Sequence, residues 1–371
     1  MARVLVIASY TPSLINFRGH LLRLLRGLGH EVLACSPNPD DATLSNLNEM
    51  GIRHVEYPLS RAGLNPLYDL RTISSLRKII RREQPDHVLA YTIKPVIYGC
   101  LAAWKEAVPH IHAMITGLGT SFQGSGAWRR TLTSLVSRLY RTALRNCENV
   151  FFQNGDDCAL FIERGLVYPD RVTTVDGSGI DLDHFAYAPL SDQPPPSFLL
   201  IARLIREKGV EVYAEAARKA KASYPAAVFR IVGYFESHPT AITKDDMASW
   251  TEHGVVEFLG AREDVREVLT DASVYCLPSY REGMPRSVLE ALAIGRPVIT
   301  TDAPGCRETV THGVNGFLVP VRDIDALAEA MNELCRNPER IKTMGAHSRA
   351  LAESRFDVHK VNDCLRVAMG L

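Results

Sequence analysis

Short runs of β-branched and aliphatic residues alternate with segments of helical period along the chain, and this alternation limits the folds that the chain can adopt. In the first half the runs lie at 4–9, 31–36, 54–59, 87–92, 110–116, 149–154 and 171–176, and the helical segments at 18–28, 66–82, 95–106 and 128–146. Strands that alternate with helices are joined by crossover connections, which favour a parallel sheet covered on both faces.

Three consecutive prolines at 194–196 interrupt this pattern. Proline has no N–H to donate to a sheet and cannot continue a helix, so a linker is expected there. The alternation then restarts, with strands at 197–203, 227–233, 255–260, 273–278 and 297–301 and helices at 208–222 and 285–294.

We therefore predict an α/β protein with two doubly wound, Rossmann-like parallel-sheet domains, at 1–190 and 191–354. A final helix within 355–371 is predicted to cross back to the first domain. The 371 residues, 46% of them hydrophobic, are enough for two cores. Ligands of such sheets bind at the carboxyl ends of the strands, which predicts a cleft between the two halves.

The net charge of the whole chain does not indicate a strongly charged partner, because Lys plus Arg and Asp plus Glu both number 42. No nucleic-acid partner is therefore expected. Between Thr120 and Cys147, however, there are basic residues and no acidic ones: Arg129, Arg130, Arg138, Arg141 and Arg145.

The helix at 128–146 carries these arginines and has one apolar face: Leu132, Leu135, Val136, Leu139, Tyr140 and Ala143. We predict that this face covers the sheet. Docking of the arginines on the anionic surface of a membrane remains a second hypothesis for the helix.

The cysteines and the amino terminus favour a cytoplasmic protein. Eight cysteines occur singly, without a Cys-x-x-Cys pair or metal-ligand spacing, which is typical of a reduced chain. The opening MARVLVIASYTPS contains an apolar run too short for a signal peptide or a membrane span. Any membrane contact is expected to be peripheral, on the inner face of the cytoplasmic membrane.

The segment REGMPRSVLEALAIGRPVITTDAPGCRE (281–308) carries the most specific chemical pattern. Its loop follows the strand at 273–278 and leads to Pro285, which suits the first position of a helix. A helix amino terminus favours phosphate, and Gly283 lets the backbone approach a ligand closely. Glu282 lies before this terminus and Glu290 lies within the helix.

This arrangement fits a nucleoside-diphosphate sugar. With the diphosphate on the helix terminus, Glu282 can accept hydrogen bonds from the sugar hydroxyls and Glu290 from the ribose hydroxyls. The negative charges require compensation, which IARLIREKG provides through Arg203 at a strand end and Lys208 at the next helix start.

Residues 198–320 resemble the donor half of family four of the retaining glycosyltransferases, which have the GT-B fold. IARLIREKG, FLGAREDV, LPSYREGMPRSVLEALAIGRPVITTDAPGCRE and NGFLVP carry the resemblance. It implies a retaining enzyme that moves a hexose or N-acetylhexosamine from a nucleoside-diphosphate sugar, with a UDP-sugar favoured. Neither a metal nor a cofactor besides this co-substrate is expected.

The same resemblance implies roles for individual residues. Arg203 and Lys208 would bind the diphosphate and stabilise it as it leaves, Glu282 would touch the transferred sugar and Glu290 would bind the ribose. Arg262 would lie near the base. The backbone of three further residues would line the phosphates: Gly283, Met284 and Pro285.

The segments AYTIKPVIYG and ITGLGTSF resemble a subgroup whose acceptors are sugars linked to undecaprenyl diphosphate in bacterial envelope polysaccharide assembly. Lys94, at a strand end, is the catalytic and acceptor-binding candidate, with an ordinary solvated lysine as the alternative. Ile93 stands about where many members carry a histidine.

Three further residues are predicted on the acceptor side. Arg18, at the first strand-to-helix turn, is predicted to meet a phosphate of the lipid. Gly117 and Gly119 are predicted to shape a loop near the acceptor, with a purely structural turn as the alternative.

Other polar patterns receive structural interpretations. Asp181 and Asp183 form an Asp-x-Asp in a turn, and His110 and His112 lie in an apolar strand as core or edge residues. Two alternative functions are a two-domain sugar-binding protein without transfer activity and a nucleotide-sugar epimerase. The donor pattern argues against the epimerase.

Overall fold

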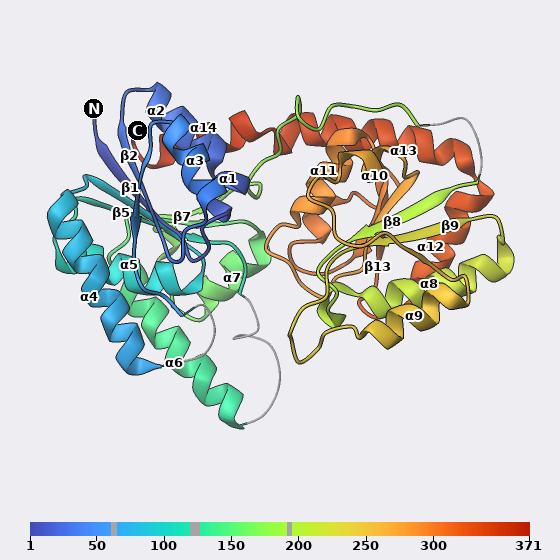
Figure 1. Cartoon of the computed structure of the whole chain (residues 1–371), viewed down its shortest axis with the longest axis horizontal. Coiled ribbons are helices and arrows are strands. Elements are labelled where there is room, and N and C mark those ends of the chain that lie inside the picture. The colour runs from blue at the N-terminus through green and yellow to red at the C-terminus, as the bar shows by residue number, and fades with distance from the viewer. Residues whose placement is uncertain (61–64, 119–126, 191–194) are drawn as a thin grey trace. The chain divides into compact units, whose positions relative to one another are not determined.

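The structure is a computed structural model that describes residues 1–60, 65–118, 127–190 and 195–371, with side chains described from Thr133 onward in the helix that begins at Ala127. The chain divides into two compact units (Figure 1). The first comprises Met1–Ser178 and His359–Leu371, and the second comprises Gly179–Val358. The predicted boundary lies at the prolines, whereas this division falls at Ser178.

The first unit contains a seven-stranded sheet in the order β3-β2-β1-β4-β5-β6-β7. Its strands are β1 (Arg3–Ile7), β2 (Glu31–Ser36), β3 (Arg53–Glu56), β4 (His87–Tyr91), β5 (His110–Ile115), β6 (Asn149–Phe152) and β7 (Val172–Thr174). Every neighbouring pair is parallel. The order reverses between β1 and β4, so their carboxyl ends mark the topological switch point where α/β sheets bind ligands.

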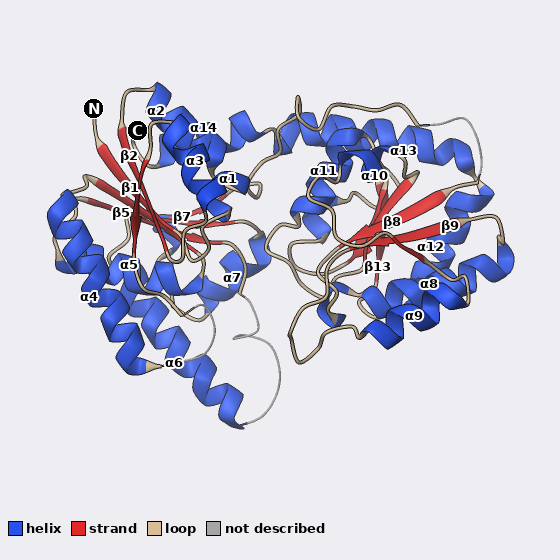
Figure 2. Cartoon of the chain, in the orientation of Figure 1, coloured by secondary structure: helices blue, strands red, loops and turns tan. Residues whose placement is uncertain are grey.

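Helices cover both faces of this sheet (Figure 2). On one face lie α1 (Ser13–Asn16), α2 (Gly19–Gly27) and α3 (Asp41–Glu49), and on the other α4 (Pro66–Glu83), α5 (Ile93–Lys105), α6 (Ala127–Leu144) and α7 (Gly155–Glu163). Right-handed crossovers produce this segregation, because connections that run in opposite directions along the sheet pass over opposite faces.

The final helix α14 (Val358–Ala368) packs on the first unit, beside α1 to α3. Leu365 and Met369 are buried there, and the Asn149 side chain donates a 2.8 Å hydrogen bond to the carbonyl of Ala368. The helix that follows the second unit therefore contributes to the core of the first.

The second unit contains a six-stranded parallel sheet in the order β10-β9-β8-β11-β12-β13. The strands are β8 (Ser197–Ile201), β9 (Val228–Val232), β10 (Glu257–Phe258), β11 (Val274–Leu277), β12 (Val298–Thr301) and β13 (Gly316–Val319). The switch point here lies between β8 and β11, whose carboxyl ends lead directly into the two predicted donor segments.

Helices again cover both faces. On one side lie α8 (Val210–Ser223), α9 (Lys244–Glu252) and α12 (Ile324–Arg336), and on the other α10 (Arg266–Thr270), α11 (Arg286–Ile294) and a π-helical turn (Ala352–Phe356). Helix α13 (Pro338–Leu351) packs against both α11 and α12. The two Rossmann-like sheets confirm the predicted fold class. None of the described helices combines the length and the apolar character needed to cross a membrane.

One predicted helix face needs correction. In α6, Val136, Tyr140 and Ala143 are buried as expected, but Leu135 is 47% exposed and lies outside the buried stripe. Leu132 lies outside the described side chains.

Candidate active site

The loop that carries Lys208 is fixed against the carboxyl end of β11 by a glycine. After β8, the chain forms a short 3₁₀ turn at Arg206–Lys208 and enters α8 through Gly209, whose φ is +74°. A Cβ at Gly209 would lie 2.1 Å from the carbonyl oxygen of Pro278. Only glycine tolerates both this conformation and this approach, so Gly209 brings Lys208 next to the loop after β11.

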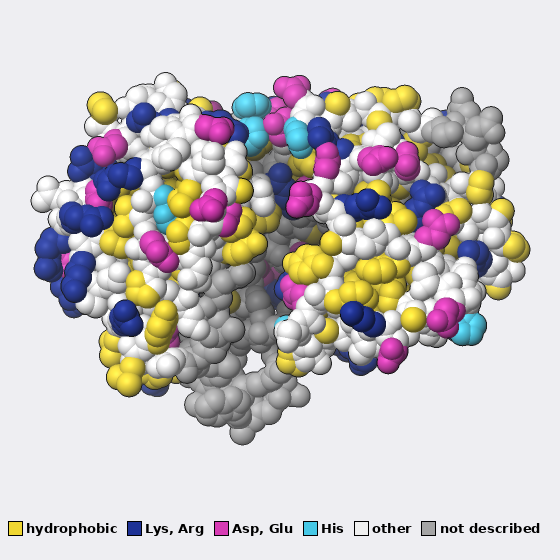
Figure 3. Space-filling model, viewed as in Figure 1, with side chains coloured by type: hydrophobic (Ala, Val, Ile, Leu, Met, Phe, Trp, Pro, Cys, Tyr) yellow, Lys and Arg dark blue, Asp and Glu magenta, His cyan; other side chains and the backbone are white. Residues whose placement is uncertain are grey.

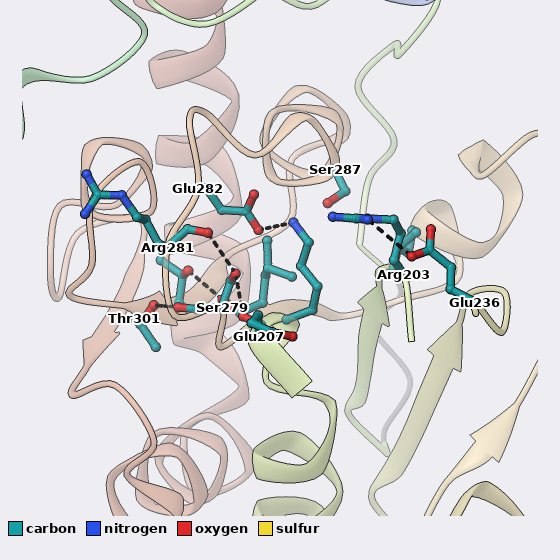
Figure 4. A network of polar contacts seen from close by, with 12 residues as sticks. Arg203, Glu207, Glu236, Ser279, Arg281, Glu282, Ser287 and Thr301 are labelled. Carbon is teal, nitrogen blue, oxygen red and sulfur yellow. Dashed lines mark hydrogen bonds and ion pairs between the residues drawn. The ribbon is translucent and has the colours of Figure 1, made fainter. Parts of the chain in front are cut away.

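Hydrogen bonds to backbone carbonyls join the two loops. The Ser279 hydroxyl and the Tyr280 N–H donate to the carbonyl of Glu207, at 3.1 and 2.9 Å. The Thr301 hydroxyl donates in turn to the carbonyl of Ser279 (Figure 4). The strand ends of β11 and β12 and the start of α8 are thereby held in one polar network.

The loop after β12 supports Glu282 from its other side. The N–H of Glu282 donates to the carbonyl of Pro304 at 2.9 Å. Gly305 has φ +79°, and a Cβ there would lie 2.4 Å from the carbonyl oxygen of Glu282. This backbone-to-backbone approach fixes the position of Glu282.

The structure brings two of the predicted donor residues, Lys208 and Glu282, into contact at this edge. Lys208 Nζ contacts a carboxylate oxygen of Glu282, and both side chains are mostly buried. Arg203 Nη1 lies 3.3 Å from a carboxylate oxygen of Glu236, with Arg203 about half exposed (Figure 4). Each of these two cations therefore has a carboxylate partner within the same unit.

Glu290 lies within α11, where its carboxylate pairs with Arg286 Nε at 3.0 Å. Burial raises the pKa of Glu290, with Asp264 adding to the rise and Arg286 opposing it. A buried carboxylate with a raised pKa beside polar loops is typical of ligand sites.

A buried tyrosine braces the first turn of α11. The Tyr275 hydroxyl lies 2.7 Å from the hydroxyl of Ser287 and donates to the carbonyl of Ile201 at 3.1 Å. It therefore links the end of β8, just before Arg203, to the helix that carries Glu290.

The remaining predicted donor residues occupy the surrounding loops. Arg262 is exposed after β10, Gly283 and Met284 are half-buried, and Pro285 is buried. Pro285 is the N-cap of α11, with φ −75° and ψ 108°. The helix therefore begins at Arg286, one residue later than predicted.

On the first unit, Lys94 lies in the first turn of α5, after the carboxyl end of β4. Its Nζ is 3.0 Å from Asp69 Oδ1 in the first turn of α4, and both side chains are only 12% and 11% exposed. The solvated alternative for Lys94 is therefore wrong. Burial raises the pKa of Tyr98, and the neighbouring Asp69 carboxylate raises it further.

Arg18 lies at the predicted strand-to-helix turn but is buried, with 1% exposure. Its guanidinium is 5.3 Å from the centre of the Tyr91 ring, and Nη2 lies 2.7 Å from Met114 Sδ. Tyr91 and Met114 lie at the ends of β4 and β5, so Arg18 does reach the carboxyl edge of the sheet.

One of the two predicted acceptor-side glycines, Gly117, lies within the described residues. Gly117 follows β5 with φ +130°, a conformation that favours glycine. Gly119 lies outside the described residues.

The structural interpretations of the other motifs agree with the structure. Asp181 Oδ1 accepts hydrogen bonds from the N–H groups of Asp183 and His184, at 3.0 and 2.9 Å, and so closes a turn. His112 is buried against His87, while His110 pairs with Glu148 at 2.8 Å. Among the described residues no group of three or more His, Cys, Asp or Glu side chains has the arrangement of a metal site.

Sequence reasoning missed three polar residues of these edges: Glu236, Asp69 and Tyr275. Glu236 follows the predicted strand at 227–233, so its place at a carboxyl strand end was a usable signal. Asp69 and Tyr275 lie inside predicted elements, where no local pattern distinguishes them from ordinary helix and strand residues.

Two family matches divide the chain in a way similar to its division into two compact units. Residues 16–176 match the family described as Glycosyl transferase 4-like domain, and residues 195–337 match the family described as Glycosyl transferases group 1. The two matches cover the acceptor-side and donor-side residues described above, apart from the final helix.

Two similar proteins have named activities. N,N'-diacetylbacillosaminyl-diphospho-undecaprenol alpha-1,3-N-acetylgalactosaminyltransferase of Campylobacter jejuni is 27% identical, over 93% of this chain and 92% of its own length. UDP-Gal:alpha-D-GlcNAc-diphosphoundecaprenol alpha-1,3-galactosyltransferase of Escherichia coli is 25% identical, over 79% of this chain and 77% of its own.

Solved structures share the fold over the whole chain. Anabaena Alr3699/HepE in complex with UDP and glucose aligns with a TM-score of 0.79 at 19% identity, covering all of both chains. The lipopolysaccharide outer core galactosyltransferase WaaB aligns with a TM-score of 0.72 at 16% identity. The similarity in fold, together with the family matches, confirms the predicted GT-B architecture.

Proposed function

We propose, since the chain belongs to the glycosyl transferases group 1, that it moves a hexose or N-acetylhexosamine from a nucleoside-diphosphate sugar to a lipid-linked glycan. The reaction is a retaining, metal-independent transfer in bacterial envelope polysaccharide or glycan assembly. The named activities of the Campylobacter jejuni and Escherichia coli relatives, both of which act on diphospho-undecaprenol-linked sugars, support this class of acceptor.

The observation that carries the proposal is the polar network at the carboxyl edge of the second sheet. Two cations, Lys208 and Arg203, lie there with Glu282, on loops that lead into a helix amino terminus. In the proposed complex both cations bind the diphosphate, which offsets the charge that develops as the nucleotide leaves. Cationic side chains thus do the work that a divalent metal does in other transferases.

The acids on either side of the diphosphate hold the rings. Glu282 accepts hydrogen bonds from the sugar, and Glu290 from the ribose, with Arg262 nearest the base. The backbone of Gly283, Met284 and Pro285 lines the phosphates. Glu282 contacts Lys208, so in this arrangement the residue that orients the sugar also orients the cation that stabilises the leaving group.

The acceptor is assigned to the first unit. Lys94 is held by Asp69 at the carboxyl edge, where its ammonium can bind a phosphate or hydroxyl oxygen of the acceptor. Because Arg18 is buried against Tyr91, we assign it to supporting this edge, with contact to the lipid phosphate requiring a side-chain movement. Gly117 shapes the adjoining loop.

An anionic membrane surface is the proposed location of the acceptor. At its amino-terminal end α4 exposes Leu67 (81%) and Leu70 (62%), and further along it exposes basic residues such as Arg71 and Lys78. Figure 3 shows hydrophobic side chains near one end of α4 and Lys and Arg side chains toward the other. Apolar insertion combined with basic charge favours binding to anionic bilayers.

Replacing both Leu67 and Leu70 by serine should reduce the fraction of protein that co-sediments with phosphatidylglycerol vesicles.

The donor proposal is tested by thermal-shift measurements with UDP- and GDP-sugars on wild type and Glu290→Ala. We expect stabilisation of wild type by one nucleotide class and a smaller shift for Glu290→Ala. An unchanged shift in the variant would contradict the ribose assignment.

Transfer is tested separately, by release of nucleoside diphosphate with and without a synthetic polyprenyl-diphosphate sugar. Release only with this acceptor supports the transferase. Nucleotide binding without release under any acceptor condition favours a sugar-nucleotide-binding protein that lacks transfer activity.

A further inference from the structure

The loop after β9 delivers a third carboxylate to the donor edge. Glu236 lies on this loop, and its carboxylate is 3.3 Å from Arg203 Nη1. Strands β8 and β9 are neighbours in the sheet, so the two residues follow adjacent carboxyl ends. Arg203 is 47% exposed and Glu236 23% exposed at the side chain. An ion pair this open is weak, which leaves Arg203 able to change partner.

The rest of this loop is anchored, so Glu236 is held near Arg203 by more than its own ion pair. The Thr240 hydroxyl donates to the carboxylate of Glu207, and the N–H of Arg206 donates to the carbonyl of Thr240 at 2.9 Å. Glu207 and Arg206 both belong to the 3₁₀ turn that ends at Lys208. The loop that carries Glu236 is therefore attached to the turn that carries the other donor cation.

The two cations differ in how they are paired. Lys208 contacts Glu282 with both side chains mostly buried, and Glu282 has an assigned role on the sugar. Glu236 has no such role in the proposed donor complex. A carboxylate beside a diphosphate repels it, and the planar guanidinium of Arg203 matches phosphate oxygens as well as it matches a carboxylate.

We propose that Glu236 is an exchangeable counter-ion: it pairs with Arg203 in the unbound protein and gives up this contact when the donor diphosphate binds. This inference rests on the proposed function and adds a residue that sets nucleotide affinity. The exchange weakens binding of the donor and of the released nucleoside diphosphate alike. Glu236 re-forms the pair as the product leaves, which favours product release.

The test compares wild type with Glu236→Gln by isothermal titration with UDP and GDP, and with uridine and guanosine, which lack phosphates. Glu257→Gln is the matched control, because Glu257 pairs with Arg230 Nε at 3.0 Å on β9 and β10 of the same unit, without a donor cation. We expect Glu236→Gln to bind the nucleoside diphosphate about three- to tenfold more tightly, a gain that shrinks in high salt. Binding of the nucleosides, and all binding by Glu257→Gln, should match wild type.

A double-mutant cycle separates exchange at Arg203 from general charge repulsion. In an Arg203→Ala background the gain from Glu236→Gln should fall below about twofold. The inference is wrong if Glu236→Gln gives the full gain in affinity in the Arg203→Ala background. It is also wrong if Glu236→Gln, with a normal unfolding transition, binds the nucleoside diphosphate no more tightly than wild type. In both cases the proposed function stands. Absence of UDP and GDP binding in wild type and in Glu236→Gln overturns both.

Discussion

The two units share a doubly wound sheet but differ in the groups that they place at its carboxyl edge. The second unit presents cations and acids on loops held together by backbone contacts, as at Gly209 and Gly305. The first presents an enclosed ion pair, Lys94 with Asp69, in the first turns of two helices, and the buried Arg18. The same topology therefore carries one edge with cations and acids on loops, which we propose to bind a diphosphate, and one edge whose described cations Lys94 and Arg18 are enclosed. The difference lies in the loops and helix starts.

The largest expected effect is that of Lys208→Ala, which changes the proposed donor site alone. Lys208→Ala removes the cation that contacts Glu282 and that we assign to the leaving diphosphate. Transfer should fall about 100- to 1,000-fold, as for loss of other groups that stabilise developing charge. The measurement is kcat/KM for donor in a coupled assay of nucleotide release. Loss of less than about fivefold would contradict a role in leaving-group stabilisation.

The control for this variant is Lys219→Ala. Lys219 contacts Asp325 on the surface of the same unit, away from the site loops. It should retain wild-type kinetics, because an exposed pair of this kind contributes little to stability or function.

The next prediction concerns the first unit. Asp69→Asn leaves the mostly buried Lys94 ammonium without its counter-charge, so the variant should lose about 1–3 kcal/mol of unfolding free energy. It should also raise the KM for acceptor about tenfold, because the ammonium is no longer oriented. The KM for donor should stay unchanged, since we assign the donor site to the other unit.

Glu106→Gln is the matched control, because Glu106 joins the opposite ends of the same two helices through Arg77 and Arg81. The Glu106 side chain is itself only 9% exposed, but Arg77 and Arg81 are 42% and 67% exposed and can be solvated without it. This change leaves no buried charge unpaired and should therefore cost less unfolding free energy than Asp69→Asn. If Glu106→Gln raises the acceptor KM as much as Asp69→Asn does, the effect comes from helix packing and the acceptor assignment of Lys94 is wrong.

The comparison also shows how far sequence reasoning reaches. Alternating strands and helices determine a doubly wound fold through local period and crossover handedness, so most strands were predicted within a few residues. The donor segments were predicted because Glu282 and Lys208 lie at strand ends with turn residues beside them. Helices α3, α7, α9, α10, α12 and α13 and strand β13 were not predicted, because their polar faces and short apolar runs give a weaker signal.

The burial of individual charged side chains could not be predicted from the sequence. Arg18 was predicted to face a ligand, yet it is enclosed by Tyr91 and Met114, which follow it by more than seventy positions. Arg296 is fully buried and donates to the carbonyls of Ala188, Leu269 and Thr270. Partners so distant in sequence leave no local pattern, and the same holds for Asp69 with Lys94.

Acid should act on the two units in opposite directions. Burial lowers the pKa of His112 from 6.5 to about 4, so the folded first unit excludes a proton that the unfolded chain binds. Its contribution to stability is complete above pH 6.5 and is lost as the pH falls toward 4, by about 2 kcal/mol at pH 5. Hydrogen exchange of β5 and β6 should accelerate between pH 7 and 5 after correction for the intrinsic rate.

The reference for this measurement is the exchange of β11 and β12 in the second unit, which should not accelerate over the same range. In a His112→Phe variant the dependence on pH should largely disappear from β5 and β6, whatever the change in absolute stability. Persistence of the full dependence would assign it to other groups.

The smallest predicted effect concerns stability and ligand binding in the second unit. Because burial raises the pKa of Glu290 above its ordinary value of 4.5, the ionised carboxylate destabilises the folded protein at neutral pH. Glu290→Gln should therefore raise the unfolding free energy of the unliganded protein slightly at pH 7, by roughly 1 kcal/mol or less. Below pH 4.5 wild-type Glu290 is protonated in both the folded and the unfolded state, so this advantage should vanish.

The same variant should lose nucleotide-induced stabilisation, because glutamine cannot accept both ribose hydroxyls as a carboxylate does. A variant that is more stable alone but less stabilised by nucleotide would identify Glu290 as a residue kept for its ligand, whereas Asp69 stabilises the fold and the acceptor edge together.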